Sequence, residues 1–183
     1  MQYAKAVTEQ TRKLSALITN ILKLNRLENQ QIFPEKKQYN LSEQVCECLL
    51  GFEQAWEKKN LEISTDIEEE VYVCQDAELL SLVWNNLFSN AVKFCKERGT
   101  VSLAVQRDGD GVIVSVSDEG CGISPEVGAR IFDKFYQGDT SHATQGNGLG
   151  LALVKRVVDI LNGEISVQSV YGQGSTFTVK FRR

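Results

Sequence analysis

Three short segments carry amides, a carboxylate or glycines at spacings that could do chemistry. The first, residues 82–94, reads LVWNNLFSNAVKF. Asn86, Asn90 and Lys93 are four and then three residues apart, so on a helix they share one face. Side-chain amide oxygens suit Mg2+, which prefers hard oxygen ligands, and the ammonium suits phosphate. Taken alone, the segment fits a solvated helix face almost as well.

The second segment, DEGCGI, spans residues 118–123 and directly follows an apolar strand pattern. Asp118 could accept a hydrogen bond from an exocyclic amine such as that of adenine. Gly120 and Gly122 would let a flat ligand approach the backbone closely. A tight turn after a strand would explain this pattern equally well if it stood alone.

The third segment, GNGLG at residues 146–150, leads into the apolar helix pattern LALVKRVVDIL. Glycines at a helix N-terminus present backbone N–H groups, and the helix dipole favours an anion there. A dinucleotide-binding fingerprint would need an apolar strand before the glycines, whereas the polar loop DTSHATQ precedes them. A P-loop would need Gly-Lys-Ser/Thr, which is absent, so both rivals fail.

The elements that must position these segments begin with a helix over residues 2–29. Val7, Leu14 and Ile21 repeat every seven residues, and Leu17 and Leu24 follow two of them by three. This is the apolar seam of a helical bundle, which one helix cannot bury alone. The alternative is that the helix packs on the domain after it. The polar segment around Pro34 predicts a linker.

After the linker, the spacing of the apolar residues changes repeatedly between that of a helix and that of a strand. The predicted helices span 40–59, 76–96, a short stretch from Pro125, and 149–161; the predicted strands span 61–67, 71–74, 100–106, 112–117, 164–170 and 175–181. The pattern predicts an α+β domain, in which helices cover a mainly antiparallel sheet, preceded by one long helix.

The composition and charge of the chain argue against several classes of function. The formal net charge is -4, so a nucleic-acid partner is not indicated. No apolar run approaches the roughly 20 residues that span a bilayer, and the N-terminus lacks a signal-peptide pattern. The five cysteines are odd in number and scattered, which favours reduced thiols over disulfides or a zinc site.

The order and spacing of the motifs resemble the Bergerat ATP-binding fold of the gyrase, chaperone, histidine-kinase and mismatch-repair superfamily. Asn86–Lys93 resembles the N box, Asp118–Gly122 the G1 box, IFDKFYQ (131–137) the F box, Gly146–Gly150 the G2 box, and GQGSTF (172–177) the closing glycine motif. The resemblance covers residues 37–183 and implies a two-layer sandwich of a mixed, mainly antiparallel sheet and about three helices.

Within the superfamily the chain is most similar to two-component sensor histidine kinases. Members that hydrolyse ATP carry a glutamate where this chain has Asn86, and an amide cannot take a proton from water. Residues 1–33 resemble the second helix of the dimerisation hairpin, whose first helix carries the acceptor histidine. The only histidine here is His142, in the lid loop. We therefore expect a fragment whose acceptor lies upstream of residue 1.

The resemblance implies a role for each motif residue. For Mg2+ and phosphate it implies that Asn90 binds the metal, Asn86 orients a metal-bound water and Lys93 contacts phosphate. For ATP it implies that Asp118 binds adenine with Gly120 and Gly122 making room, that Gly146, Gly148, Leu149 and Gly150 hold the triphosphate, and that Thr176 assists Asp118 through a water. Phe132 and Phe135 would anchor the lid. Gln137 stands where an arginine is common, so Lys134 would supply that charge.

The resemblance also implies partners and a location. We expect ATP and Mg2+ as ligands, and the upstream histidine helix, a response regulator and a second copy of the chain as partners. We expect the cytoplasmic part of a membrane-anchored bacterial sensor. An anti-sigma-factor-type serine kinase and a degenerate nucleotide-binding or dimerisation module are the alternatives.

Overall fold

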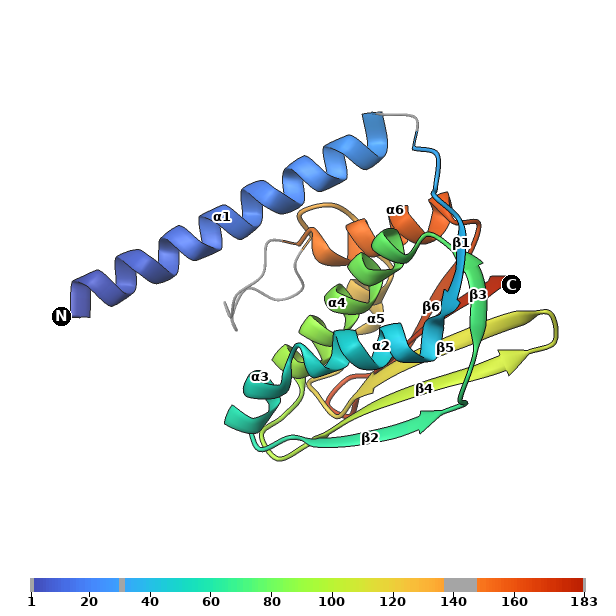
Figure 1. The fold of residues 1–183 in the computed structure, drawn as a ribbon. Helices are drawn as coiled ribbons and strands as arrows, with labels where there is room; N and C mark the ends of the chain where they lie inside the picture. The colour runs from blue at the N-terminus through green and yellow to red at the C-terminus, as the bar shows by residue number, and fades with distance from the viewer. Residues whose placement is uncertain (1, 30–31, 137–147, 183) are drawn as a thin grey trace.

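The molecule is a helix-covered sheet with one long helix projecting from it (Figure 1). The computed structural model describes residues 2–29, 32–136 and 148–182. In chain order the elements are α1 (Gln2–Asn29), β1 (Lys37–Asn40), α2 (Leu41–Leu50), α3 (Glu53–Lys58), β2 (Glu62–Ile67), β3 (Tyr72–Gln75), α4 (Ala77–Phe94), β4 (Thr100–Asp108), β5 (Gly111–Asp118), α5 (Pro125–Gly128), α6 (Gly150–Ile160), β6 (Glu164–Val170) and β7 (Gly174–Arg182).

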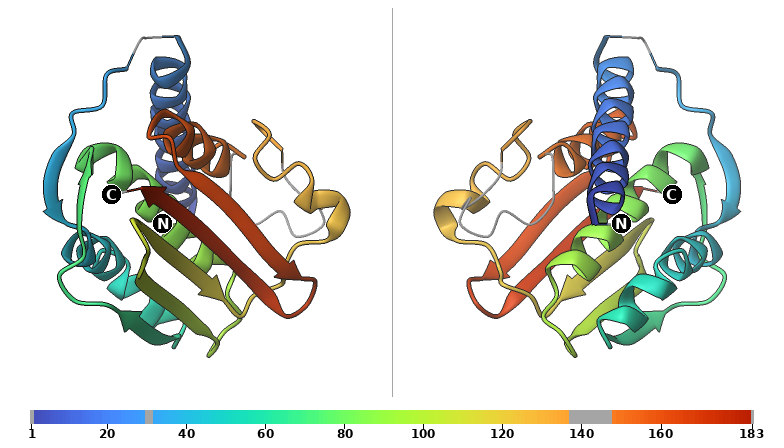
Figure 2. Two further views of the ribbon diagram at one scale, coloured as in Figure 1. Left: turned by 90° about the vertical axis from the view of Figure 1, so that its right-hand side faces the viewer. Right: turned by 90° about the vertical axis from the view of Figure 1, so that its left-hand side faces the viewer.

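The main sheet has five strands in the order β2-β4-β5-β7-β6. β2 and β4 run parallel, and the other three pairs run antiparallel. Figure 2 shows α2, α4 and α6 on one side of this sheet. The expected α+β fold with a mixed, mainly antiparallel sheet and about three covering helices is confirmed.

Strict alternation explains why the central strands form and which face they bury. β4 and β5 alternate buried valine or leucine with half-exposed, mostly small or polar residues over most of their length. This period places one apolar face against the helices. α4 meets that face with buried residues that include Leu80, Trp84, Leu87 and Phe88. Trp84 and Phe181 pack edge to face, with ring centroids 6.3 Å apart.

Two parts of the predicted secondary structure were wrong. The expected helix over 40–59 is divided into α2 and α3, because Gly51 ends α2 and Phe52 turns inward against Phe88, with ring centroids 6.4 Å apart. β1 was not expected, because its sequence KQYN is polar and does not alternate. It forms through antiparallel pairing with β3, a contact distant in sequence.

α1 shows features of both alternatives that the sequence left open, a seam for a helical bundle and packing on the following domain. Its last turns pack on α6 through Leu24 and Leu27, which are buried, and Arg156 Nε donates to the Leu27 carbonyl oxygen at 3.0 Å. Farther from the domain, Leu14 is 57% and Ile18 is 48% exposed. The apolar seam therefore stays open over that stretch, while the side chain of Val7 lies outside the described part. None of the described helices has the length and hydropathy to cross a bilayer.

Candidate functional site

α4 carries the predicted stripe of Asn86, Asn90 and Lys93 along one side of the helix. Asn86, Asn90 and Lys93 are half-buried, whereas Asn85 and Ser89 beside them are exposed. Asn86 Nδ2 donates to the Leu82 carbonyl oxygen at 2.7 Å, which fixes the amide and turns its oxygen away from its own helix. That oxygen lies against α6, because a Cβ added at Gly150 would be 2.9 Å from it.

Lys93 completes the stripe near the C-terminal end of α4. Its ammonium lies 4.3 Å from the centroid of the Phe94 ring, and partial burial lowers its pKa. Within residues 2–29, 32–136 and 148–182, no carboxylate forms a salt bridge with it. The charge is therefore placed for an anion that approaches along this edge.

The N-terminus of α6 is formed by the glycine segment. Gly148 has φ +66, and a Cβ there would lie 2.6 Å from the carbonyl carbon of Phe135. Phe135 N–H donates to the Gly148 carbonyl oxygen at 2.9 Å, so the F-box and G2-box segments are joined. Leu149 occupies the N-cap position and supplies no side-chain cap, in contrast to Asn40 of α2 and Asp76 of α4.

Asp118 ends β5 on the helix-covered side, in the same alternation as Val114 and Val116. Burial raises its pKa to about 6, while the Gly120 N–H and the charge of Lys59 oppose that rise. A Cβ at Gly120 would overlap both the Asp118 carboxylate and the Phe94 carbonyl oxygen. Asp118 is thus a partly buried acceptor held beside the C-terminal end of α4.

A row of polar residues continues across the sheet from Asp118. Ser175 on β7 lies directly opposite Asp118, and Ser169 on β6 lies opposite Ser175. The two serine hydroxyl oxygens are 3.0 Å apart. Asp118, Ser169, Ser175 and Thr176 border one pocket.

Ser175 was missed in the sequence, where Thr176 was chosen. Alternation along β7 gives the signal that could have found it. Phe177 and Val179 are buried on the helix side, so Ser175 shares their face. Thr176 Oγ1 instead lies 2.9 Å from Ser117 Oγ.

The structure places three F-box residues that the sequence singled out. Phe132 packs against the core, whereas the Phe135 side chain is 61% exposed. Lys134 forms a salt bridge with Glu28 of α1, with Nζ and Oε1 2.6 Å apart. Gly146, His142 and Gln137 lie outside the described residues.

α4 lies against both of the other predicted segments. Its middle meets the start of α6 at Gly150, and its end meets the G1 segment at Gly120. The eight residue steps from Asn86 to Phe94 correspond to about 12 Å of helix. Among described residues there is no group of three or more His, Cys, Asp or Glu that could hold a metal, so a metal here would depend on amide oxygens.

Residues 75–183 match the family model of histidine kinase-, DNA gyrase B- and HSP90-like ATPases. The chain is 38% identical, over 97% of its length, to the circadian input-output histidine kinase CikA of Synechococcus elongatus, covering 24% of that protein. It is 33% identical, again over 97%, to the sensor-like histidine kinase SenX3 of Mycobacterium bovis, covering 44%. The chain thus spans less than half of either relative.

Solved structures agree with the fold. Full-length ShkA in complex with AMPPNP has a TM-score of 0.83 and 30% identity, covering 98% of this chain and 38% of that one. The catalytic domain of the histidine kinase ThkA has a TM-score of 0.73 and 27% identity, covering 81% of this chain and 95% of that one.

Proposed function

Because the chain belongs to the histidine kinase-, DNA gyrase B- and HSP90-like ATPase family, we propose that it is the ATP-binding catalytic part of a sensor histidine kinase. The observation that supports this proposal most directly is that the N-box, G1-box and G2-box segments meet at α4. Asn86 lies against Gly150, and Phe94 lies against Gly120 beside Asp118. The names of the relatives and the AMPPNP complex of the structural neighbour support the assignment.

The reaction moves the γ-phosphoryl group of ATP to a histidine of the longer protein. The bond from the γ-phosphorus to the β,γ-bridging oxygen breaks, a phosphorus–nitrogen bond forms, and the imidazole loses a proton. Phosphoryl transfer depends mainly on positioning and charge stabilisation. Asn86 fits that requirement, because an amide can orient a metal-bound water yet cannot act as a base for hydrolysis.

The metal and phosphate roles follow the stripe on α4. Asn90 would ligate Mg2+ through its side-chain oxygen, a hard donor of the type that this cation prefers. A Mg2+ ion held there by Asn90 would neutralise charge on the phosphate oxygens. Lys93 contacts the same phosphates, since its ammonium has no carboxylate partner in the described part of the chain and lies along the same edge.

The remaining residues divide between the two ends of the nucleotide. Asp118 accepts a hydrogen bond from the adenine amine, with Gly120 and Gly122 leaving room for the ring. Ser175 takes the supporting place beside that carboxylate that was expected for Thr176, which pairs with Ser117. Gly146, Gly148, Leu149 and Gly150 offer backbone N–H groups to the triphosphate, where the dipole of α6 also favours negative charge. Lys134 supplies an additional charge.

We further propose that residues 1–33 are the second helix of a dimerisation hairpin and that residues 37–183 form the catalytic domain. The exposed seam at Leu14 and Ile18 supports this assignment, since its burial needs other helices. The partners are then the upstream histidine helix, a second copy of the protein and a response regulator. The location is the cytoplasmic side of a membrane-anchored sensor.

Nucleotide binding and phosphotransfer test the proposal separately. The chain should bind a non-hydrolysable ATP analogue in the presence of Mg2+ and lose most of that affinity in EDTA. It should phosphorylate an added helical hairpin bearing the acceptor histidine, giving an acid-labile, alkali-stable phosphoramidate. An acid-stable phosphoserine on a protein acceptor would favour the serine-kinase alternative, and no nucleotide binding would favour a degenerate module.

A further inference from the structure

The C-terminal end of α4 is held by a lysine from the neighbouring helix. Lys59 follows directly after α3, and its Nζ donates to the carbonyl oxygens of Val92 at 2.9 Å, Lys93 at 2.8 Å and Cys95 at 2.8 Å. An ammonium has three donors, so this geometry uses all of them. Because the last carbonyls of a helix carry partial negative charge, a cation placed there is stabilising.

The same turn forms one wall beside Asp118. The Phe94 carbonyl oxygen faces Gly120 so closely that no side chain fits between them. Cys95 pairs with Gly120 in an antiparallel bridge, and Lys96 N–H donates to the Glu119 carbonyl oxygen at 3.2 Å. The backbone that follows Asp118 is therefore attached to the turn that Lys59 holds.

We propose that Lys59 is a positioning residue for the adenine end of the nucleotide site. Its ammonium fixes the last carbonyls of α4 next to Asp118 and places a positive charge near that carboxylate, which accepts a hydrogen bond from a purine amine. This inference rests on the proposed function, because it takes Asp118 as the purine acceptor.

Burial raises the pKa of Asp118, and two groups oppose that rise, the Gly120 N–H and then the charge of Lys59. Among the described residues, Lys59 is the one charged side chain that lowers the pKa of Asp118, against a larger rise from burial. The Cys95 thiol also faces Asp118, but burial raises its pKa, so it stays neutral near pH 7. Glu119 is paired with Lys96 at 3.3 Å, and Lys93 lies over the Phe94 ring. Loss of the Lys59 charge should therefore move the Asp118 pKa upward.

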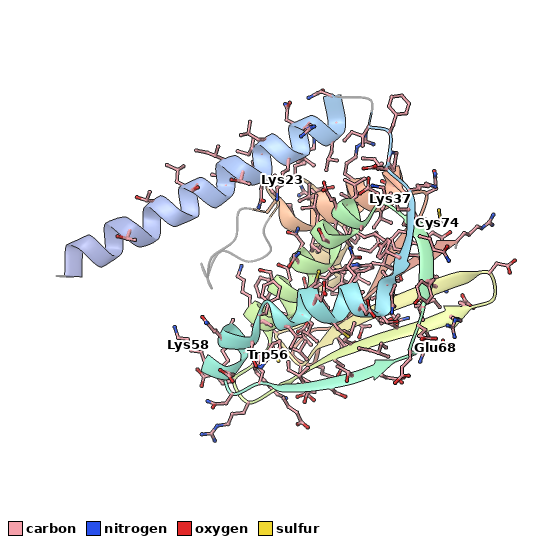
Figure 3. All side chains as sticks on the ribbon, viewed as in Figure 1. Lys23, Lys37, Trp56, Lys58, Glu68 and Cys74 are labelled. Atoms are coloured by element: carbon pink, nitrogen blue, oxygen red, sulfur yellow. The ribbon has the colours of Figure 1, made fainter. Side chains whose placement is uncertain are left out.

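The chain offers a matched control in the adjacent residue. Lys58 is exposed, lies in the last turn of α3 (Figure 3), and belongs to neither the α4 cap nor the proposed site. We would compare Lys59→Met with Lys58→Met, which change net charge equally. Binding of a non-hydrolysable ATP analogue is measured between pH 5.5 and 8.5, and the Asp118 carboxyl carbon is titrated by NMR without nucleotide.

Lys59→Met should raise the binding midpoint from near pH 6 by about one unit, a typical effect of losing a nearby opposite charge. Affinity should then fall about fivefold at pH 6 and remain nearly unchanged at pH 8, since at pH 8 most carboxylates are ionised in both proteins. Lys59→Arg, which keeps the charge, should restore the midpoint, and Lys58→Met should leave it in place.

The outcomes separate this inference from the function. An Asp118 titration that is the same in the folded Lys59→Met and Lys58→Met proteins would overturn the role of Lys59 even if ATP binds normally. Failure of the unsubstituted chain to bind nucleotide would overturn the proposed function instead. If Lys59→Met does not fold, Lys59→Gln keeps hydrogen-bond donors without the charge and supplies the same comparison.

Discussion

Two helices flank the candidate site, α4 with its C-terminus and α6 with its N-terminus, and the two termini differ in how their backbone groups are bonded. α4 finishes with its carbonyls held by Lys59, and its last residues are attached to the G1 segment. α6 begins at glycines, with Leu149 providing no side-chain cap. One end is closed by the protein's own groups, whereas the first N–H groups of the other have no acceptor within the helix.

This difference matches what each end must do. Recognition of a flat base needs a fixed acceptor and a fixed wall, and the backbone contacts around Asp118 provide both. Binding of a charged triphosphate needs N–H donors that the helix does not use for its own hydrogen bonds, and the first turn of a helix provides those. We infer that rigidity is concentrated at the adenine end, and the following predictions test this contrast.

Gly122→Ala should cause the largest loss. Gly122 has φ +65, and a Cβ there would overlap the Val170 carbonyl, so the turn must open. We expect the free energy of unfolding in urea to fall by more than about 3 kcal/mol. Gly109→Ala is the control, since its φ of +57 is similar but nothing lies within 4 Å. It should cost about 1 kcal/mol. Equal losses from the Gly122 and Gly109 substitutions would mean that Gly122 is not closely packed against Val170.

Asp118→Asn should weaken binding of a non-hydrolysable ATP analogue about 10-fold to 100-fold at pH 8. The reason is the loss of a hydrogen bond to a charged acceptor, worth about 1.5–3 kcal/mol. Asp110→Asn, in the turn at the other end of the same hairpin, should change nothing. Calorimetry gives both values. Unchanged affinity in Asp118→Asn would mean that the adenine ring does not bind at Asp118.

The same carboxylate should destabilise the fold at neutral pH. With a folded-state pKa of about 6 against an ordinary value of 3.8, the folded protein keeps a proton that the unfolded chain releases. The free energy of unfolding should therefore fall as pH rises from about 4 to 6. Asp118→Asn should be more stable than the natural chain by about 3 kcal/mol at pH 7 and equal to it near pH 3.5. Denaturation at several pH values measures this, and a flat difference would contradict it.

The sequence predicted the scaffold better than the contacts between its elements. Strands such as β4 and β5 alternate strictly, and Asp76 caps α4 as its position suggested, because both signals are local. β1 was missed because only pairing with β3 stabilises its polar residues. The division of the helix over 40–59 was missed because Phe52 turns towards Phe88, which is distant in sequence.

The site shows the same limit. Asn86, Asn90 and Asp118 stand out in the sequence because polar residues interrupt apolar patterns. Lys59 and Ser175 do not, because a lysine at a helix end and a serine in a strand are ordinary. Their importance depends on what lies opposite, namely the carbonyls of α4 and the carboxylate of Asp118.

Glu28→Gln should have the smallest effect and tests whether the phosphate end is adjustable. The ion pair between Lys134 and Glu28 is partly exposed and should contribute only about 0.5 kcal/mol to stability. Its removal releases Lys134 towards the triphosphate, so affinity for the ATP analogue should rise about twofold, while Asp118 titrates as before. Asp159→Asn breaks a comparable exposed pair with Lys155 and is the control. If Glu28→Gln instead weakened binding, the pair with α1 would be holding Lys134 in its binding position, and the phosphate end would be as fixed as the adenine end.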